Sequence, residues 1–215
     1  LNKTENVNIY NLVIDGLLQL QNRGYDSAGI CLIKNGQFEV NKYASTNKIN
    51  ALDKLVSLKL NSANTGCGIA IGHNRWATHG IKNDTNAHPH LSYDNNFVIV
   101  HNGIIENYLE LRSQLEARGH KFKSETDTES VAHLLSDARK AHHGDLAAAM
   151  REVCKQLRGS FTLLAIHADD PDRIVGARRN SPLVVGVGAG DGPGAGAGAG
   201  AGVPPEHGPR SFQAP

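Results

Sequence analysis

Apolar residues recur at helical spacing in five stretches of the chain. The first stretch runs from Asn11 to Gln21, where apolar side chains lie three and four residues apart and the pattern ends before Asn22, Arg23 and Gly24. The same spacing predicts four further helices, over residues 47–60, 105–118, 129–139 and 145–157.

Shorter apolar runs predict strands between these helices. Residues 28–34 and 37–43 flank the turn signal Asn35-Gly36 and are typical of a hairpin. Further strand-like runs cover residues 68–76, 97–103, 160–168, 173–180 and 182–188. Pairs of strands alternate with pairs of helices and do not follow a strict βαβ rhythm, so we expect a layered α+β fold.

Length and charge place the chain among ordinary globular proteins. It has 215 residues, of which 20% are charged, and a formal net charge of +1. One domain with short appendages is therefore expected, and the near-neutral charge favours neither nucleic acid nor a membrane surface as partner. No apolar run is long enough to cross a bilayer, and the first residues do not resemble a secretory signal, so a cytoplasmic location is expected.

The cysteines and histidines do not predict a disulfide framework or a metal site. Cys31, Cys67 and Cys154 are widely spaced, which favours reduced thiols. His88 and His90 flank a proline, and no zinc-binding spacing occurs. We therefore expect no metal ligands.

The composition changes near the C-terminal end. From Gly186 the chain consists mainly of Gly, Ala and Pro, which offer almost no side chain for a core. We predict a globular domain over residues 1–188 and a disordered tail over residues 189–215.

Two stretches place polar side chains beside glycine at strand ends. In HNRWATHG (73–80), Arg75, Thr78 and His79 could hold a carboxylate; the alternative is a solvated loop with Trp76 in the core. In VHNGIIEN (100–107), Asn102 and Gly103 come just after an apolar strand and could donate to an oxyanion; the alternative is an Asn-Gly turn.

A third stretch has an acidic residue at every second position. SETDTES (124–130) carries Glu125, Asp127 and Glu129, and either Ser124 or Thr126 is expected to cap the next helix. One of the acids is left to bind an ammonium group. Together the three stretches describe a site for an amino acid whose side-chain carbonyl is attacked, such as glutamine or asparagine, but they include no nucleophile.

Six motifs in this order resemble the N-terminal glutaminase domain of the glutamine–fructose-6-phosphate aminotransferase (isomerizing) family, whose members form glucosamine 6-phosphate. The resemblance covers nearly all of residues 9–188 and rests on NRGYDSAG (22–29), HNRWATHG (73–80), NAHPH (86–90), VHNGIIEN (100–107), SETDTE (124–129) and ARRNSPLVVGVG (177–188). Other class II amidotransferases, such as the one that makes phosphoribosylamine, share similar elements.

The resemblance implies the αββα sandwich of the N-terminal nucleophile hydrolases, with no cofactor. It assigns the glutamine carboxylate to Arg75, Thr78 and His79, the oxyanion hole to Asn102 and Gly103, and the ammonium group to Asp127. Trp76 would belong to the loop that covers glutamine and gates ammonia transfer, and Arg23 would support the active-site end of the chain.

The family's nucleophile is a cysteine at the mature N-terminus, followed by Gly-Ile, whose free α-amine can serve as the general base. The chain starts at Leu1, so we expect a preceding strand with this cysteine to be missing and the chain to be inactive as it stands. We expect Cys31 and Cys67 to be buried in the core and Cys154 to lie on an apolar helix face.

The family continues into two sugar-isomerase domains that bind fructose 6-phosphate, which the Gly/Ala/Pro tract replaces here, and the complete enzyme is expected to be a homo-oligomer. Three alternatives stay open from the residues alone. One is a non-catalytic glutamine-binding module, and another is a related amidotransferase with another acceptor, such as phosphoribosyl pyrophosphate. The third is a purely structural protein with no ligand site.

Overall fold

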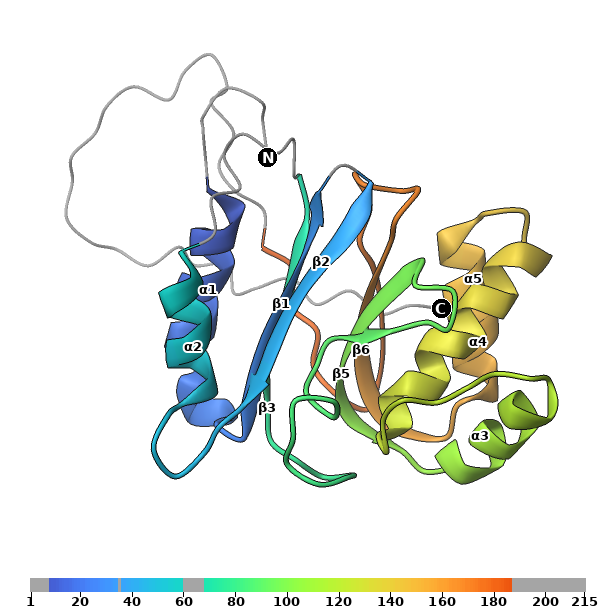
Figure 1. Ribbon diagram of the computed structural model, residues 1–215. Coiled ribbons are helices and arrows are strands. Elements are labelled where there is room, and N and C mark those ends of the chain that lie inside the picture. Colours follow the sequence, from blue (N-terminus) through green and yellow to red (C-terminus); the bar gives the residue numbers. More distant parts are fainter. Residues whose placement is uncertain (1–7, 35, 60–67, 187–215) are drawn as a thin grey trace, which may run out of the picture.

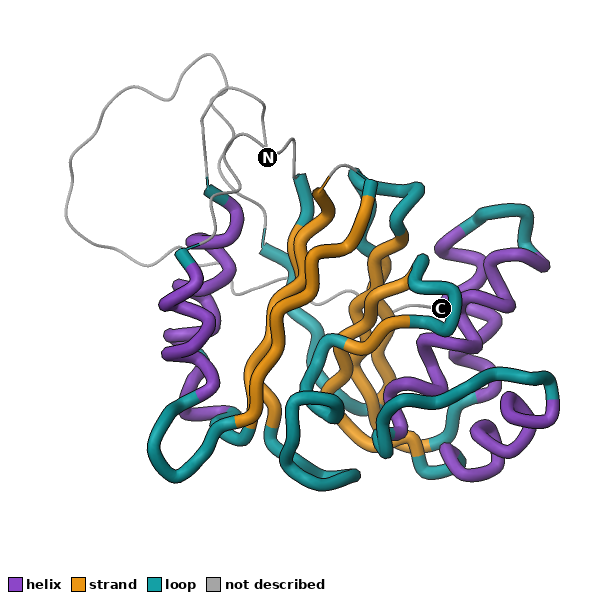
Figure 2. Tube along the Cα trace, viewed as in Figure 1, coloured by secondary structure: helices purple, strands orange, loops and turns teal. Residues whose placement is uncertain are grey.

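Two antiparallel sheets lie face to face, and helices cover the outer face of each (Figure 1). The computed structural model describes residues 8–34, 36–59 and 68–186. In Figure 2 the strands form the middle of the molecule and the helices lie on both outer sides. The four layers confirm the predicted αββα sandwich.

The first pair of layers comes from the N-terminal third of the chain. Its sheet has the order β2-β1-β3. The strands are β1 (Ser27–Lys34), β2 (Gln37–Ala44) and β3 (Ala70–Arg75), and the covering helices are α1 (Ile9–Gln19) and α2 (Ala51–Leu58), with the short 3-10 helix η1 (Gln21–Arg23) after α1. The side chains of Asn8 and Asn50 accept backbone N–H groups at the starts of α1 and α2, which fixes where each helix begins.

The second pair of layers comes from the rest of the described chain, after β3. Its sheet has the order β4-β5-β6-β7, and three helices cover it. The strands are β4 (His90–Leu91), β5 (Phe97–Ile105), β6 (Gly159–His167) and β7 (Val175–Arg179), and the helices are α3 (Tyr108–Ala117), α4 (Asp127–Ala141) and α5 (Leu146–Gln156).

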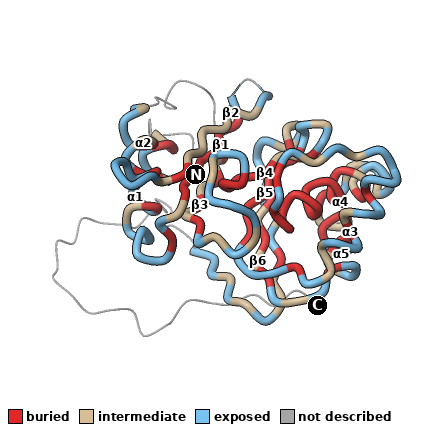
Figure 3. Tube along the Cα trace, turned by 60° about the horizontal axis from the view of Figure 1, so that its bottom comes forward, coloured by how far each residue is buried: buried red, intermediate tan, exposed pale blue. Residues whose placement is uncertain are grey.

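Buried side chains fill the space between each pair of layers, and Figure 3 shows this burial concentrated along the strands and on the inner sides of the helices. Strand β1 is buried on both faces, so alternate residues serve different layers. Ile30 and Leu32 pack under α1 and α2, whereas Cys31 and Ile33 pack against the other sheet. The expectation that Cys31 is a core residue is therefore confirmed.

The predicted hairpin and all five helices are present, but several of their bounds differ, and the short strand β4 was not predicted. Strand β5 continues to Ile105, which pairs with Gly159, so α3 begins at Tyr108 and not at residue 105. The strand predicted over residues 182–188 is wrong for the described part of it, because residues 182–186 have no regular structure. Asn180 turns the chain with a positive φ of 54°, and Pro182 lacks an N–H group for a strand ladder.

Three predictions fall outside the described residues: those for Cys67, for the last two residues of the strand predicted over 182–188, and for the tail over 189–215. No helix in the described ranges combines the length and apolar character needed to cross a bilayer.

Candidate functional site

A cavity of about 300 Å³ opens where β3 ends and β5 passes beside it. All eight residues selected from the sequence line it: Arg23, Arg75, Trp76, Thr78, His79, Asn102, Gly103 and Asp127. The two sheets therefore bring together residues from four separate segments. The sequence gave no role in this site to the other lining residues, which are His73, Asn74, His88, His101, Ile104, Thr126 and Thr128.

Arg75 is a buried cation with spare hydrogen-bonding capacity. The residue as a whole is 4% exposed, and the Nη2 of its side chain donates to the backbone oxygen of His79. Its Nη1 is buried and has no partner among the described residues. Burial lowers the pKa of Arg75, while Asp26 and Asp127 oppose that shift. A guanidinium group held in this way is suited to a carboxylate ligand.

Asp127 supplies the opposite charge from the first turn of α4. The residue is 4% exposed, and its Oδ2 accepts the backbone N–H of Ile105 at 2.8 Å. Its Oδ1 accepts the Thr128 hydroxyl at 3.3 Å. Because that hydroxyl has one proton, its oxygen accepts from Nδ1 of His101 at 3.0 Å. Asp127 is thus fixed in position while facing the cavity.

Asn102 and Gly103 lie inside β5, opposite Thr162 and Phe161 of β6, and not after the end of a strand. The strand-like run predicted over residues 97–103 contains both residues, but β5 continues two residues beyond it, so their placement at the end of the strand is wrong, and so is the alternative of an Asn-Gly turn. Gly103 has a φ of 128°, and a Cβ atom there would lie 2.1 Å from the Ser160 carbonyl oxygen. Only glycine fits this position.

Residues 76–89, which we call the pocket loop, carry Thr78 and His79 over the cavity. Asp26 accepts the Ala77 N–H at 3.0 Å and pairs with Lys82 at 2.6 Å. Burial raises the pKa of Asp26, but its hydrogen bonds from Lys82 and Ala77 outweigh this and lower it. Asp26 therefore stays ionised and holds the start of the pocket loop.

Lys42 of β2 holds the far end of the pocket loop. Its Nζ donates to three backbone carbonyl oxygens, of Thr85 at 3.0 Å, Ala87 at 2.7 Å and Pro89 at 3.1 Å. Burial lowers the pKa of Lys42 to about 8, with Glu129 the strongest opposing influence. The ammonium form, which has three N–H donors, therefore predominates at pH 7.

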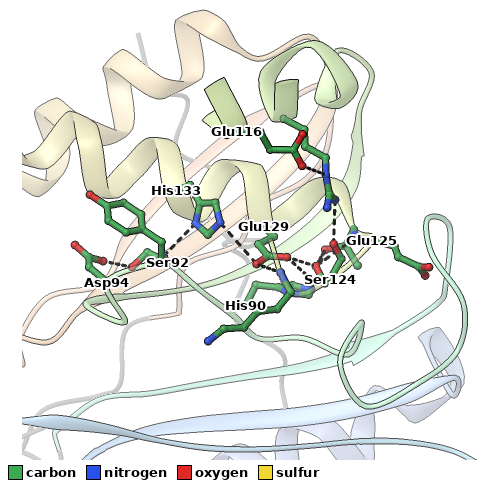
Figure 4. Close-up of polar contacts among 12 residues, drawn as sticks. His90, Ser92, Asp94, Glu116, Ser124, Glu125, Glu129 and His133 are labelled. Atoms are coloured by element: carbon green, nitrogen blue, oxygen red, sulfur yellow. Dashed lines mark hydrogen bonds and ion pairs between the residues drawn. The ribbon is translucent and has the colours of Figure 1, made fainter. Parts of the chain in front are cut away.

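The three acids of residues 124–130 have different partners. Glu125 accepts the Ile81 N–H at 3.0 Å and an Asn86 amide at 2.9 Å, and so pins the pocket loop. Glu129 accepts the N–H groups of Lys123 and Ser124 at 2.8 and 2.6 Å (Figure 4). Asp127 alone of the three lines the cavity.

The predicted cap of α4 is correct in position only. Thr126 is the N-cap residue, but its side chain makes no capping hydrogen bond. Its hydroxyl lies 3.1 Å from Nε2 of His90 and 3.0 Å from the Ser124 hydroxyl. Glu129 instead closes the turn before the helix, through the Ser124 hydroxyl at 2.6 Å and the two N–H groups.

Trp76, Thr78 and Arg23 form the exposed rim of the cavity. Trp76 is 59% exposed, so the alternative that placed it in the core is wrong. Its ring lies 5.4 Å from that of Tyr25, which is also exposed. The rim therefore has an aromatic side and a cationic one.

Three buried imidazoles line the inner wall. Burial lowers the pKa values of His73, His88 and His101, that of His73 to about 4. His73 stacks on His88 with ring centroids 4.2 Å apart, and its Nε2 lies 2.8 Å from Oδ1 of Asn102. The sequence did contain a signal for His73: in β3 it alternates with Ile71 and Arg75, so all three share one buried face.

The described cysteines lie away from this cavity. Cys31 is enclosed between the sheets, and Cys154, partly exposed on α5, packs against the helix side of the second sheet as predicted. Neither lines the cavity. Within the described ranges, no three His, Cys, Asp or Glu side chains are grouped as a metal ion would require.

Residues 73–191 match the family model described as a glutamine amidotransferase domain. Similar curated proteins are named glutamine–fructose-6-phosphate aminotransferase (isomerizing). The one from Streptomyces coelicolor is 55% identical over 177 residues, and the one from Pyrococcus horikoshii is 47% identical over 176; each alignment covers 82% of this chain and 28% of the relative. The chain thus spans less than a third of the length of these relatives.

Two solved structures have a similar fold. One is the glutamine phosphoribosylpyrophosphate amidotransferase from B. subtilis complexed with ADP and GMP, with a TM-score of 0.61 and 25% identity. The other is described as the allosteric regulatory enzyme of purine biosynthesis, with a TM-score of 0.62 and 26% identity. Each similarity covers 79% of this chain and 34% of the other.

Proposed function

The chain belongs to the glutamine amidotransferase family, and from that premise we propose that its cavity binds L-glutamine as the glutaminase part of a glutamine–fructose-6-phosphate aminotransferase. Such an enzyme hydrolyses glutamine to glutamate and passes the ammonia to fructose 6-phosphate. One observation carries the proposal: Arg75, with its unpartnered Nη1, and the fixed carboxylate of Asp127 line one cavity. A fixed cation and a fixed anion match the two charged groups of a free amino acid.

The remaining lining residues complete the proposed site. Arg75, Thr78 and His79 hold the α-carboxylate, and Asp127 takes the α-ammonium group. Trp76 and Arg23 stand at the rim, where a bound ligand passes. The amide of Asn102 and the backbone N–H of Gly103 donate to the side-chain carbonyl oxygen and stabilise it when it becomes an oxyanion, a contribution of about 3 kcal/mol per donor.

The proposed reaction needs a nucleophile that neither Cys31 nor Cys154 can supply. We assign it to an N-terminal cysteine that residues 1–215 do not include, with its own α-amine as general base. Its thiolate attacks the side-chain carbonyl carbon of glutamine, ammonia leaves, and a thioester remains. Water then hydrolyses the thioester to glutamate and the free thiol.

Sequence similarity supports fructose 6-phosphate as the acceptor. The relatives named for it reach 55% identity, whereas the amidotransferase named for phosphoribosyl pyrophosphate reaches 25%. We propose that sugar-isomerase domains partner the glutaminase part in the complete enzyme, that this enzyme is a homo-oligomer and that it is cytoplasmic.

Binding is tested by calorimetry of the chain with L-glutamine. Arg75→Ala and Asp127→Ala each remove one charged side chain that contacts the ligand. Each is expected to weaken glutamine binding at least tenfold, since hydrogen bonds to charged groups contribute about 1.5–3 kcal/mol each. Arg173→Ala removes an exposed cation outside the cavity and is the matched control. Equal binding by all four proteins, or by none, would refute the site.

Catalysis is tested with a version preceded by a Cys-Gly-Ile strand. We expect this version to release ammonia from glutamine and the chain without it to release none. Turnover by the unextended chain would disprove the assignment of the nucleophile. An extended chain that binds glutamine without turnover would favour the non-catalytic binding module.

A further inference from the structure

One hydrogen bond crosses between the two sheets at the cavity wall. Nε2 of His73, in β3, lies 2.8 Å from Oδ1 of Asn102, in β5. We propose that His73 is a positioning residue that fixes the side-chain amide of Asn102 with its Nδ2 facing the cavity. This inference rests on the proposed function, because it concerns the donor to the glutamine carbonyl.

An asparagine needs such a partner to act as a donor. Its amide oxygen and nitrogen have nearly the same shape, so a rotation of the group exchanges a donor for an acceptor. In the wrong orientation the cavity would present Oδ1 to the carbonyl oxygen of the ligand, and the two oxygens would repel each other. The described residues offer Nδ2 of Asn102 no hydrogen-bond acceptor, which leaves it available for a ligand.

His73 is suited to hold Oδ1 because its ring is itself held. The ring stacks on that of His88 at 4.2 Å with an interplanar angle of 18°. His88 is fixed in turn, since its Nδ1 accepts the backbone N–H of His101 at 3.3 Å. Burial holds the pKa of His73 at about 4, so the ring is neutral at pH 7 and carries one N–H. The contact with Oδ1 requires that proton on Nε2.

A purely structural role is the competing explanation, since the same hydrogen bond ties one sheet to the other. The two roles predict different changes in ligand selectivity. Loosening the sheets would weaken the binding of every ligand alike. Loss of amide orientation would weaken the binding of only those ligands that have a side-chain carbonyl.

The test compares L-glutamine with L-norvaline, which keeps the α-ammonium and α-carboxylate groups but has no side-chain carbonyl. Calorimetry of the chain at pH 7 is expected to show roughly 25-fold tighter binding of glutamine, because its carbonyl accepts two neutral hydrogen bonds, from Asn102 and Gly103, that contribute roughly fivefold each. His73→Phe keeps a ring against His88 but has no N–H to donate. It is expected to keep only the roughly fivefold preference due to the Gly103 N–H, with its norvaline affinity unchanged. His73→Gln, which restores a donor, is expected to recover the full preference.

Each outcome is informative. If the unmutated chain binds neither ligand, the proposed function fails. If it binds both equally, Asn102 is not a donor and the inference fails, while the roles of Arg75 and Asp127 stand. A preference undiminished in His73→Phe, or an equal weakening of the binding of both ligands, overturns the inference alone. Should His73→Phe not fold, ¹⁵N NMR of the unmutated chain decides: a proton on Nε2 of His73 supports the inference, and one on Nδ1 overturns it.

Discussion

Replacing Gly103 by alanine should open the second sheet beside the cavity. A Cβ atom at this position would lie 2.1 Å from the Ser160 carbonyl oxygen and 2.8 Å from the Phe161 Cα, both backbone atoms of β6. The backbone φ of 128° adds strain of about 1–3 kcal/mol for any residue with a side chain. Moving β5 away from β6 costs roughly 2 kcal/mol more, as for an overpacked core.

The expected loss of unfolding free energy is therefore about 4 kcal/mol, which corresponds to a fall in Tm of roughly 10 °C for a domain of this size. Urea unfolding followed by far-UV circular dichroism measures it. Gly119→Ala is the matched control, because Gly119 also has a positive φ, of 92°, but no atom within 4 Å of an added Cβ. If the two substitutions cost the same, the contact with β6 does not contribute and the reasoning is refuted.

Three further predictions concern the surroundings of the cavity. Between pH 7 and 5 the unfolding free energy should fall by about 2 kcal/mol through His73, because its folded-state pKa of about 4 lies below the ordinary 6.5 and only the unfolded chain gains the proton. Urea titrations at the two pH values should show a smaller fall for His73→Phe, and an equal fall would contradict this. Lys42→Met should cost about 3 kcal/mol by leaving three carbonyl groups unpaired, whereas exposed Lys48→Met should not change the Tm. Glu125→Ala should speed proteolysis of the pocket loop several-fold at pH 7, and a rate equal to that of Glu116→Ala would count against the anchoring role of Glu125.

The sequence predicted most of the fold because local periodicity carries that information. Helical spacing and the Asn35-Gly36 turn signal located the helices and the hairpin. The same reasoning ended the strand at Gly103 and so placed Asn102 and Gly103 at its end, whereas β5 continues to Ile105. What keeps this pair in β5 is its pairing with β6, some sixty residues further along the chain.

The residue types of three stretches predicted Arg75, Thr78, His79, Asn102 and Gly103, and the motif resemblance, which the comparisons confirm, added Arg23, Trp76 and the choice of Asp127. These eight residues do meet in one cavity, although their roles remain predictions. The supporting contacts were not predictable, since each joins residues far apart in sequence. His73 reaches Asn102 across 29 positions, and Glu125 reaches Asn86 across 39. Such pairs are set by how the layers pack.

Trp76 makes the rim of the cavity visible to spectroscopy. It is the single tryptophan of the chain, and its side chain is largely in water. Its fluorescence should therefore resemble that of free indole in the folded protein and shift to the blue when a ligand or a closing loop covers the ring. For the same reason it should change little on unfolding, so this one fluorophore reports occupancy of the cavity almost independently of global stability.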